Sequence, residues 1–124
     1  MSEESEQIKA RTKAFGVSIL RLIDTFDRRV SLKIVAWQLG KSATSTGANY
    51  RAACTARSRA EYLSKMQTSS EESDEALFWL EVLNDLGTVT SPRLPALTDE
   101  SRQLRSIIRK SLGTARRNDE MRGT

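Results

Sequence analysis

Residues 38–53 read QLGKSATSTGANYRAA, a run in which most side chains are small, hydroxylated or absent. Composition alone favours a loop, because each Gly, Ser or Thr costs roughly 0.4–1 kcal/mol relative to Ala in a helix interior. The run contains no Pro and no strand-like alternation, and its larger apolar residues recur at three- and four-residue spacing, which is typical of a helix. A helix of small residues is stable only where neighbours press closely against it. We therefore predict that residues 38–53 belong to the central helix of a bundle.

Three further helices are predicted around this one. The first spans Glu6 to about Phe26, where apolar residues form one stripe, and the second runs from Ser31 or Lys33 to about Ala56. The third begins at Arg59 and ends near Leu86. The fourth follows Thr98, which is placed to cap it ahead of two acidic residues.

Local signals define the helix ends and one internal polar residue. Ser58 and Glu61 have the spacing of a capping box, and Gly87 is a natural residue to follow a helix end. Residues 88–96 contain two Pro and form the one convincing linker. Asn49 lies in the middle of the small-residue stretch, and a buried amide needs hydrogen-bond partners. We expect it to bond to another helix, with contact to a ligand as the alternative.

Three ordered motifs carry a family resemblance: GANYR at residues 47–51, ARSRAEY at 56–62 and DEALFWLE at 74–81. Together they resemble the four helix bundle protein family, also called the 23S rRNA intervening-sequence proteins, over about residues 8–118. The resemblance implies an all-α, antiparallel up-down-up-down four-helix bundle. We expect one domain over residues 1–124, with frayed termini at 1–5 and 118–124. The family usually has Glu where this chain has Ala52, which leaves open whether a polar site of the family is retained.

Composition disfavours several classes of function. The chain has one cysteine, Cys54, and no histidine, so an internal disulfide and a cysteine zinc cluster are excluded and the commonest general acid–base residue is missing. The carboxylates at positions 71, 72, 74 and 75 spread around a helix instead of converging on a metal. We expect no enzyme, no cofactor and no metal site. No run is long enough to cross a membrane, and the acidic N-terminus is unlike a signal peptide, so we expect a cytoplasmic protein.

The basic residues give the clearest functional signal. The formal net charge is +4, and the fourth helix carries arginines on one face, away from its apolar stripe. A line of guanidinium groups suits phosphate binding, and the alternative is an ordinary solvated helix face. A second group surrounds the turn between the second and third helices. The predicted RNA- or DNA-binding residues are Arg102, Arg105, Arg109 and Arg116 on the fourth helix and Arg51, Arg57 and Arg59 at the turn.

The last turns of the third helix are apolar on every side. One face can pack inside the bundle, and we expect the other to meet a second subunit, unless the loop at 87–97 folds over it. The predicted interface residues are Phe78, Trp79, Val82 and Leu86. The family resemblance implies a ring-shaped homopentamer. It extends to a related branch, the accessory variability determinants of diversity-generating retroelements. That branch implies binding to nucleic acid and to a reverse transcriptase. The alternative function is a protein–protein adaptor, such as an accessory subunit of a reverse transcriptase or ribosome, without direct nucleic-acid binding.

Overall fold

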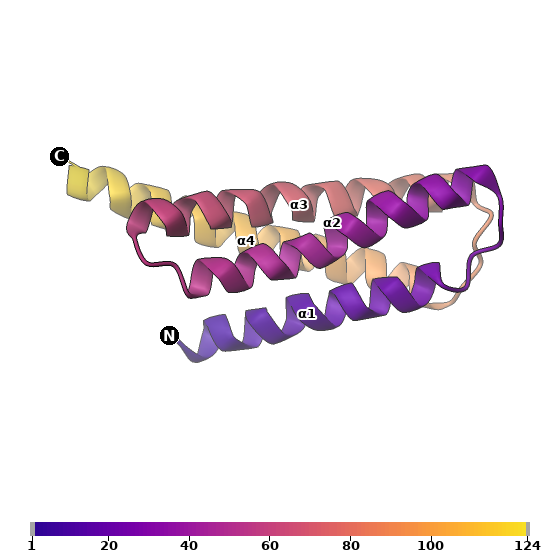
Figure 1. Cartoon of the computed structure of the whole chain (residues 1–124), viewed down its shortest axis with the longest axis horizontal. Helices are drawn as coiled ribbons and strands as arrows, with labels where there is room; N and C mark the ends of the chain where they lie inside the picture. Colours follow the sequence, from indigo (N-terminus) through magenta and orange to yellow (C-terminus); the bar gives the residue numbers. More distant parts are fainter. Residues whose placement is uncertain (1, 124) are drawn as a thin grey trace.

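The computed structural model describes residues 2–123, and these form four long helices joined by short connections. The helices are α1 (Glu3–Ile23), α2 (Val30–Cys54), α3 (Arg59–Leu86) and α4 (Arg93–Gly123). Consecutive helices run antiparallel, and both ends of the chain lie at the same end of the bundle (Figure 1). The predicted all-α, up-down-up-down four-helix bundle is confirmed.

The ends of α3 follow directly from its capping residues. The Ser58 hydroxyl accepts a hydrogen bond from the backbone N–H of Glu61 at 3.1 Å, which satisfies one of the free donors of the first turn. The Glu61 carboxylate accepts in turn from the backbone N–H of Arg57 at 3.0 Å. At the other end Gly87 adopts φ 67°, a left-handed conformation that glycine takes at no steric cost. These contacts fix α3 at the predicted bounds.

The start of α4 differs from the prediction. The helix begins at Arg93, not after Thr98, because the Ser91 hydroxyl accepts from the Arg93 N–H at 3.2 Å. Pro95 falls in the first turn, where the N–H that proline lacks has no partner within the helix. Thr98 is therefore no cap: its buried hydroxyl donates to the carbonyl of Leu94 at 2.8 Å.

Other helix bounds shift by a few residues. The structure ends α1 at Ile23 and α2 at Cys54, two or three residues before the predicted ends. Ser2 caps α1 by accepting from the Ser5 N–H, so residues 3–5 are helical, as are residues 118–123. The predicted fraying also includes Met1 and Thr124, which lie outside the described residues.

The small-residue stretch of α2 lies between α1 and α3 in close contact with both. A Cβ atom at Gly47 would lie 3.2 Å from the carbonyl carbon and oxygen of Thr12, so only glycine allows α1 to approach this closely. On the other side the Ser69 hydroxyl of α3 donates to the backbone carbonyl of Thr46 at 2.8 Å. The α1–α4 contact is the sparsest of the four between neighbouring helices. The close packing around α2 therefore holds the bundle together.

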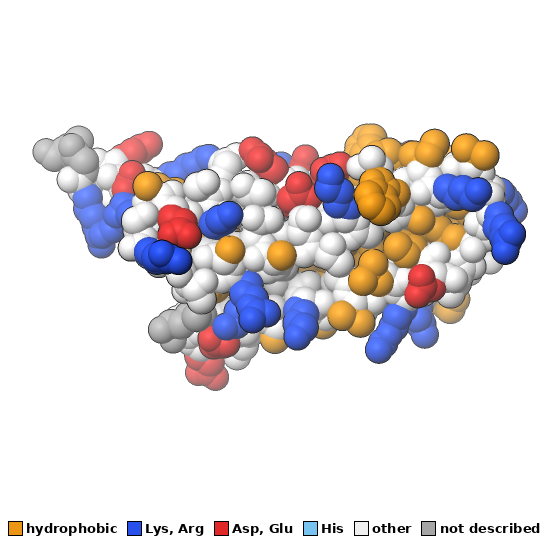
Figure 2. Space-filling view, viewed as in Figure 1, with side chains coloured by type: hydrophobic (Ala, Val, Ile, Leu, Met, Phe, Trp, Pro, Cys, Tyr) orange, Lys and Arg blue, Asp and Glu red, His pale blue; other side chains and the backbone are white. Residues whose placement is uncertain are grey.

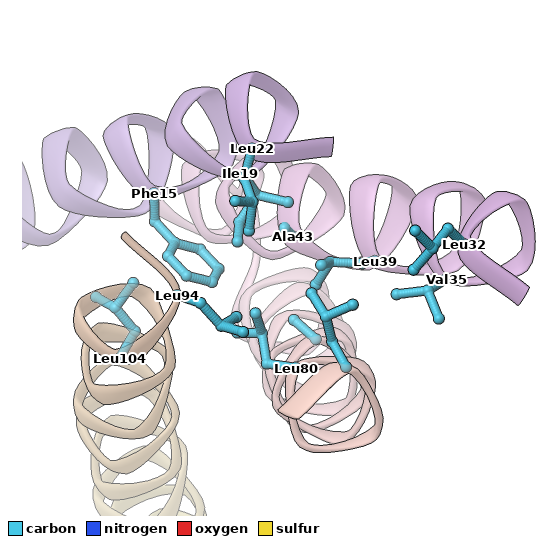
Figure 3. Close-up of a cluster of buried hydrophobic side chains, with 12 residues drawn as sticks. Phe15, Ile19, Leu22, Leu32, Val35, Leu39, Ala43, Leu80, Leu94 and Leu104 are labelled. Atoms are coloured by element: carbon cyan, nitrogen blue, oxygen red, sulfur yellow. The ribbon is translucent and has the colours of Figure 1, made fainter. Parts of the chain in front are cut away.

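Two apolar cores fill the bundle, one towards each end. The larger core lies near the α1–α2 and α3–α4 connections, and Figure 3 shows its side chains converging from all four helices. The smaller core lies towards the chain ends and contains Ile8, Tyr50, Ala53, Met66, Ile108 and Leu112. On α1, α2 and α3 the residues between the two cores are buried hydroxyl residues: Thr12, Thr46, Ser69, Ser70 and Ser73.

Asn49 does not form the interhelical hydrogen bond predicted for it. Its half-buried side-chain amide donates to the carbonyl of Ser45 at 2.9 Å, one turn back in its own helix. The buried Thr46 behaves in the same way and donates to the carbonyl of Ser42 at 2.8 Å. Polar groups on α2 are thus largely satisfied locally, and Asn49 does not specify the helix pairing. Within residues 2–123 no helix combines the length and apolar character that a bilayer span requires.

The close contact at Gly47 predicts opposite effects for two Gly→Ala substitutions. Gly113 on α4 has room, since an added Cβ would meet only the flexible Arg117 side chain at 3.5 Å. We expect Gly113→Ala to raise the free energy of unfolding by about 0.5–1 kcal/mol through helix propensity. We expect Gly47→Ala to lower it by about 1–2 kcal/mol, because overpacking against a backbone outweighs that gain. Urea denaturation measures both, and equal stabilisation by the two changes would refute the close contact.

Candidate nucleic-acid interface

The four arginines predicted on one face of α4 lie along the seam between α4 and α3. We call them the α4 ridge: Arg102, Arg105, Arg109 and Arg116. Arg105 Nε is 2.8 Å from a carboxylate oxygen of Asp74 on α3, and Arg109 Nη2 is 3.3 Å from the same atom. Arg116 donates a hydrogen bond to the side-chain carbonyl of Gln67. Arg102 is exposed and forms no ion pair with the described residues. The four arginines therefore share one side of α4, as predicted, but three of them contact α3.

Those contacts weaken the ridge as a surface for anions. One carboxylate, Asp74, offsets part of the charge of two guanidinium groups. The exposed face of α3 also carries Glu71 and Glu75 beside it. A polyanion approaching this seam meets alternating charges, and partly exposed ion pairs of this kind contribute only about 0–1 kcal/mol each to stability.

The second predicted group, at the α2–α3 turn, is divided by the fold. Arg59 forms an ion pair with Asp119 of α4 at 3.4 Å and lines a hollow of about 610 Å³ between the start of α3 and the later part of α4. Arg57 is exposed at the turn. Arg51 lies on another side of the molecule and lines a groove between α1 and α2. The structure does not bring these three arginines together into one site.

The α1–α2 groove was not predicted from the sequence. It has a volume of about 520 Å³ and an apolar floor made largely of small side chains. Its charged rim consists of Lys9 and Lys13 on α1 and Arg51 on α2, with Glu6 at one end. Lys9 forms an ion pair with Glu6 at 3.1 Å. The signal in the sequence was the pair of lysines four residues apart, but the groove itself requires two helices in contact.

The predicted interface residues on α3 divide into two exposed and two half-buried side chains. Phe78 is 53% exposed and Leu86 41%, whereas Trp79 and Val82 pack against the larger core. The connection after α3 packs its Val89 against that core as well, and Phe78 stays exposed.

Helix α2 adds exposed apolar residues that the sequence prediction missed. Trp37 and Val30 are each 71% exposed and Ile34 is 53% exposed. Their spacing of four and three residues places them on one side of α2, and that spacing was the available signal. Figure 2 shows hydrophobic side chains gathered over the end of the bundle where α2 begins and α3 ends. We call these residues the apolar surface: Val30, Ile34, Trp37, Phe78 and Leu86.

Trp79 has an unused hydrogen-bond donor beneath this surface. Its ring packs edge-on against Phe78, with centroids 5.1 Å apart and planes at 83°. Its indole N–H is buried and finds no acceptor within residues 2–123. A buried tryptophan N–H usually has a partner, and an unpaired buried polar group costs about 1–3 kcal/mol.

The one thiol of the chain lies in the smaller core with two phenols. Burial raises the pKa of Cys54, and it also raises the pKa of Tyr62. Burial, together with the neighbouring Cys54 and Tyr62, raises the pKa of Tyr50 to about 12. The Cys54 thiol therefore stays protonated at neutral pH, the opposite of what a nucleophile requires.

The acidic residues of α3 do not form a metal site in the described part of the chain. No group of three or more Asp, Glu or Cys side chains within residues 2–123 is placed to hold a metal ion. Burial raises the pKa of Glu72, with a further contribution from Glu75, while Lys41 of α2 acts in the opposite direction. Lys41 is thus within electrostatic range of this part of α3.

Two comparisons place the chain among known proteins. A family model described as 23S rRNA-intervening sequence protein matches residues 4–110. The fold is similar to the crystal structure of a protein of unknown function from the S23 ribosomal protein family of Bacteroides thetaiotaomicron. That match has a TM-score of 0.78 and 25% sequence identity, and it covers 88% of this chain and 97% of the other. No curated protein matches the sequence.

The raised pKa of Tyr50 predicts a loss of stability in alkali. An unfolded phenol ionises near pH 10, whereas Tyr50 in the folded chain keeps its proton to about pH 12. The unfolded state therefore binds fewer protons above pH 10, so this contribution is complete below pH 10 and is lost as the pH rises to about 12. Between pH 9 and 12 we expect the free energy of unfolding of Tyr50→Phe to fall by about 1–2 kcal/mol less than that of the wild type. Urea denaturation at each pH measures both. Identical pH profiles for the two proteins would contradict the assignment.

Proposed function

The chain belongs to the 23S rRNA-intervening sequence protein family, and we propose that it is an oligomeric, non-enzymatic protein of the cytoplasm that binds RNA or DNA through its basic surface residues. The observation that supports this function is the display of Lys and Arg on exposed helix faces of a closely packed bundle. Exposed examples occur on three helices and at a turn: Lys13, Arg51, Arg57, Arg102 and Lys110.

Binding of this kind acts on phosphates. Lys and Arg that neutralise phosphates release condensed counterions, which supplies affinity without regard to base sequence. The side chains around the α1–α2 groove include no aromatic ring on which a base could stack. The proposed binding is therefore sensitive to salt and indifferent to sequence.

Assembly of several copies accounts for the apolar surface. Single exposed hydrophobic residues are ordinary, but a group rimmed by polar residues is typical of an interface. We propose that the apolar surface contacts a neighbouring copy in a homo-oligomer, with a pentameric ring as the expected form. A ring would also repeat the basic side chains and strengthen their field.

A protein–protein adaptor is the second candidate function. The observation that favours it is the 71% exposure of Trp37, because tryptophan is enriched at the centres of protein interfaces. In that case the apolar surface receives a different protein, and nucleic acid is not bound directly.

Salt dependence tests the proposed function. We expect a fluorescein-labelled 20-nucleotide RNA of mixed sequence to bind at 50 mM salt. With about three phosphate contacts per strand, the dissociation constant should rise about 10- to 20-fold at 200 mM, as measured by fluorescence anisotropy. A second RNA of equal length and different sequence serves as the control and should bind within about threefold of the first. An affinity that is unchanged by salt, or absent at 50 mM, would rule out the function.

The apolar surface is tested by the mass in solution. We expect the wild-type chain to give a multiple of 13.9 kDa in multi-angle light scattering, and the double variant Trp37→Ser/Phe78→Ser to give the single-chain mass. Met121→Ser is the control, since Met121 is 76% exposed in the last turns of α4, outside the apolar surface. A wild-type protein at 13.9 kDa would argue against self-association and favour the adaptor.

A further inference from the structure

The positive charge of the chain is concentrated on the α1–α2 pair. Residues 7–57 hold ten Lys or Arg and only two Asp, a net charge of +8, while the remaining residues hold ten Lys or Arg and fourteen Asp or Glu, a net charge of −4. Helix α2 contains no acidic residue, and α1 contains none after Glu6. The two Asp, Asp24 and Asp27, lie in the connection between the helices. The half of the bundle formed by α1 and α2 is therefore the strongly cationic half.

Ion pairs occur in both halves of the bundle. On the α1–α2 side, Lys9 pairs with Glu6, Arg11 with Glu100 of α4, and Arg29 with Asp27. On the α3–α4 side, Asp74 and Asp119 pair with three arginines. On the α1–α2 side, Lys13 and Arg51 form no ion pair with any described residue. Figure 2 shows basic side chains along α1 and acidic side chains along the α3 edge and near the N-terminus.

The shape of the α1–α2 groove suits an extended anion. Its lining runs along α1 from Glu6 to Leu20, which is about 21 Å at 1.5 Å per residue. That length matches about six nucleotides of a strand that rises 3.4 Å for each. Gly16 and Gly47 lie in the floor of the groove, where each packs against the other helix, so neither places a side chain in the groove.

The cations stand on both sides of this groove. Lys9 and Lys13 lie one helical turn apart on α1, and Arg51 is on α2. A single small anion would engage only one or two of them, whereas a chain of phosphates can contact all three. The salt bridge from Glu6 to Lys9 is partly exposed, so exchanging Glu6 for a phosphate costs little free energy.

We propose that the α1–α2 groove is the site at which this protein binds the phosphodiester backbone of RNA or DNA. Lys9, Lys13 and Arg51 contact successive phosphates, and the α4 ridge makes a minor contribution. The inference rests on the proposed function and adds a location to it. Because no aromatic ring lines the groove, contacts are to phosphate and sugar, and base identity has little effect on affinity.

Two triple variants that remove equal charge test this location. The groove variant is Lys9→Gln/Lys13→Gln/Arg51→Gln, and the matched ridge variant is Arg102→Gln/Arg109→Gln/Arg116→Gln. Each variant is titrated at 50 mM salt against a labelled 20-nucleotide single-stranded RNA and the single-stranded DNA of the same sequence. The double-stranded RNA and double-stranded DNA of that sequence are the other two probes. Circular dichroism and light scattering establish that fold and mass equal those of the wild type. We expect the groove variant to bind at least tenfold more weakly and the ridge variant to stay within threefold.

The outcomes separate the site from the function. If the wild type binds and the ridge variant loses as much affinity as the groove variant, or more, the proposed location is wrong while the function stands. If the wild type binds none of the probes, the proposed function fails and the location fails with it. Binding of polyglutamate as tightly as RNA would also overturn the inference, because the groove would then be a site for acidic peptides. The logarithm of the binding constant falls linearly with the logarithm of the salt concentration. If this slope is smaller by about 2 for the groove variant, the variant has lost about three phosphate contacts on a single strand.

Discussion

Gly47 of α2 lies against the backbone of Thr12 in α1, and on the opposite side the carbonyl of Thr46 accepts a hydrogen bond from Ser69 of α3. These adjacent residues set the distances between three helices. Bulky side chains would bury more apolar area at this level, but they would also push the helices apart. The small residues here bury less apolar area, but they allow the helices to lie close together. The two apolar cores on either side bury the apolar area that the middle of the bundle lacks.

The same close approach connects the fold to the proposed binding. The small residues of α2 that face α1 leave a floor made largely of small side chains, and the lysines of α1 lie beside it. The hydroxyl groups in the middle of the bundle donate mainly to nearby backbone carbonyls, so they are satisfied without a network of side chains. Lys13 of α1 and Arg51 of α2 pair with no carboxylate of the described residues, whereas Arg105 and Arg109 of α4 meet Asp74 of α3. The cationic character of the bundle therefore depends on which helices are neighbours.

The sequence predicts the fold well where signals are local. Ser58, Glu61 and Gly87 define both ends of α3, and helical spacing identifies the other three helices. It fails at Thr98, because an N-cap signal there competes with the earlier start that Ser91 provides.

The candidate site was less predictable, because it depends on contacts between helices. Periodicity shows that Arg105 and Arg109 share a face of α4, but not that this face meets Asp74, which is remote in the sequence. The α1–α2 groove and the α2 part of the apolar surface likewise exist only once the helices are placed together. Hydrogen exchange of the backbone amides tests the central claim most directly. If α2 is clamped between α1 and α3, the amides of residues 39–50 exchange most slowly in the chain, near the rate of global unfolding. Exchange there as fast as in residues 113–123 would contradict the account.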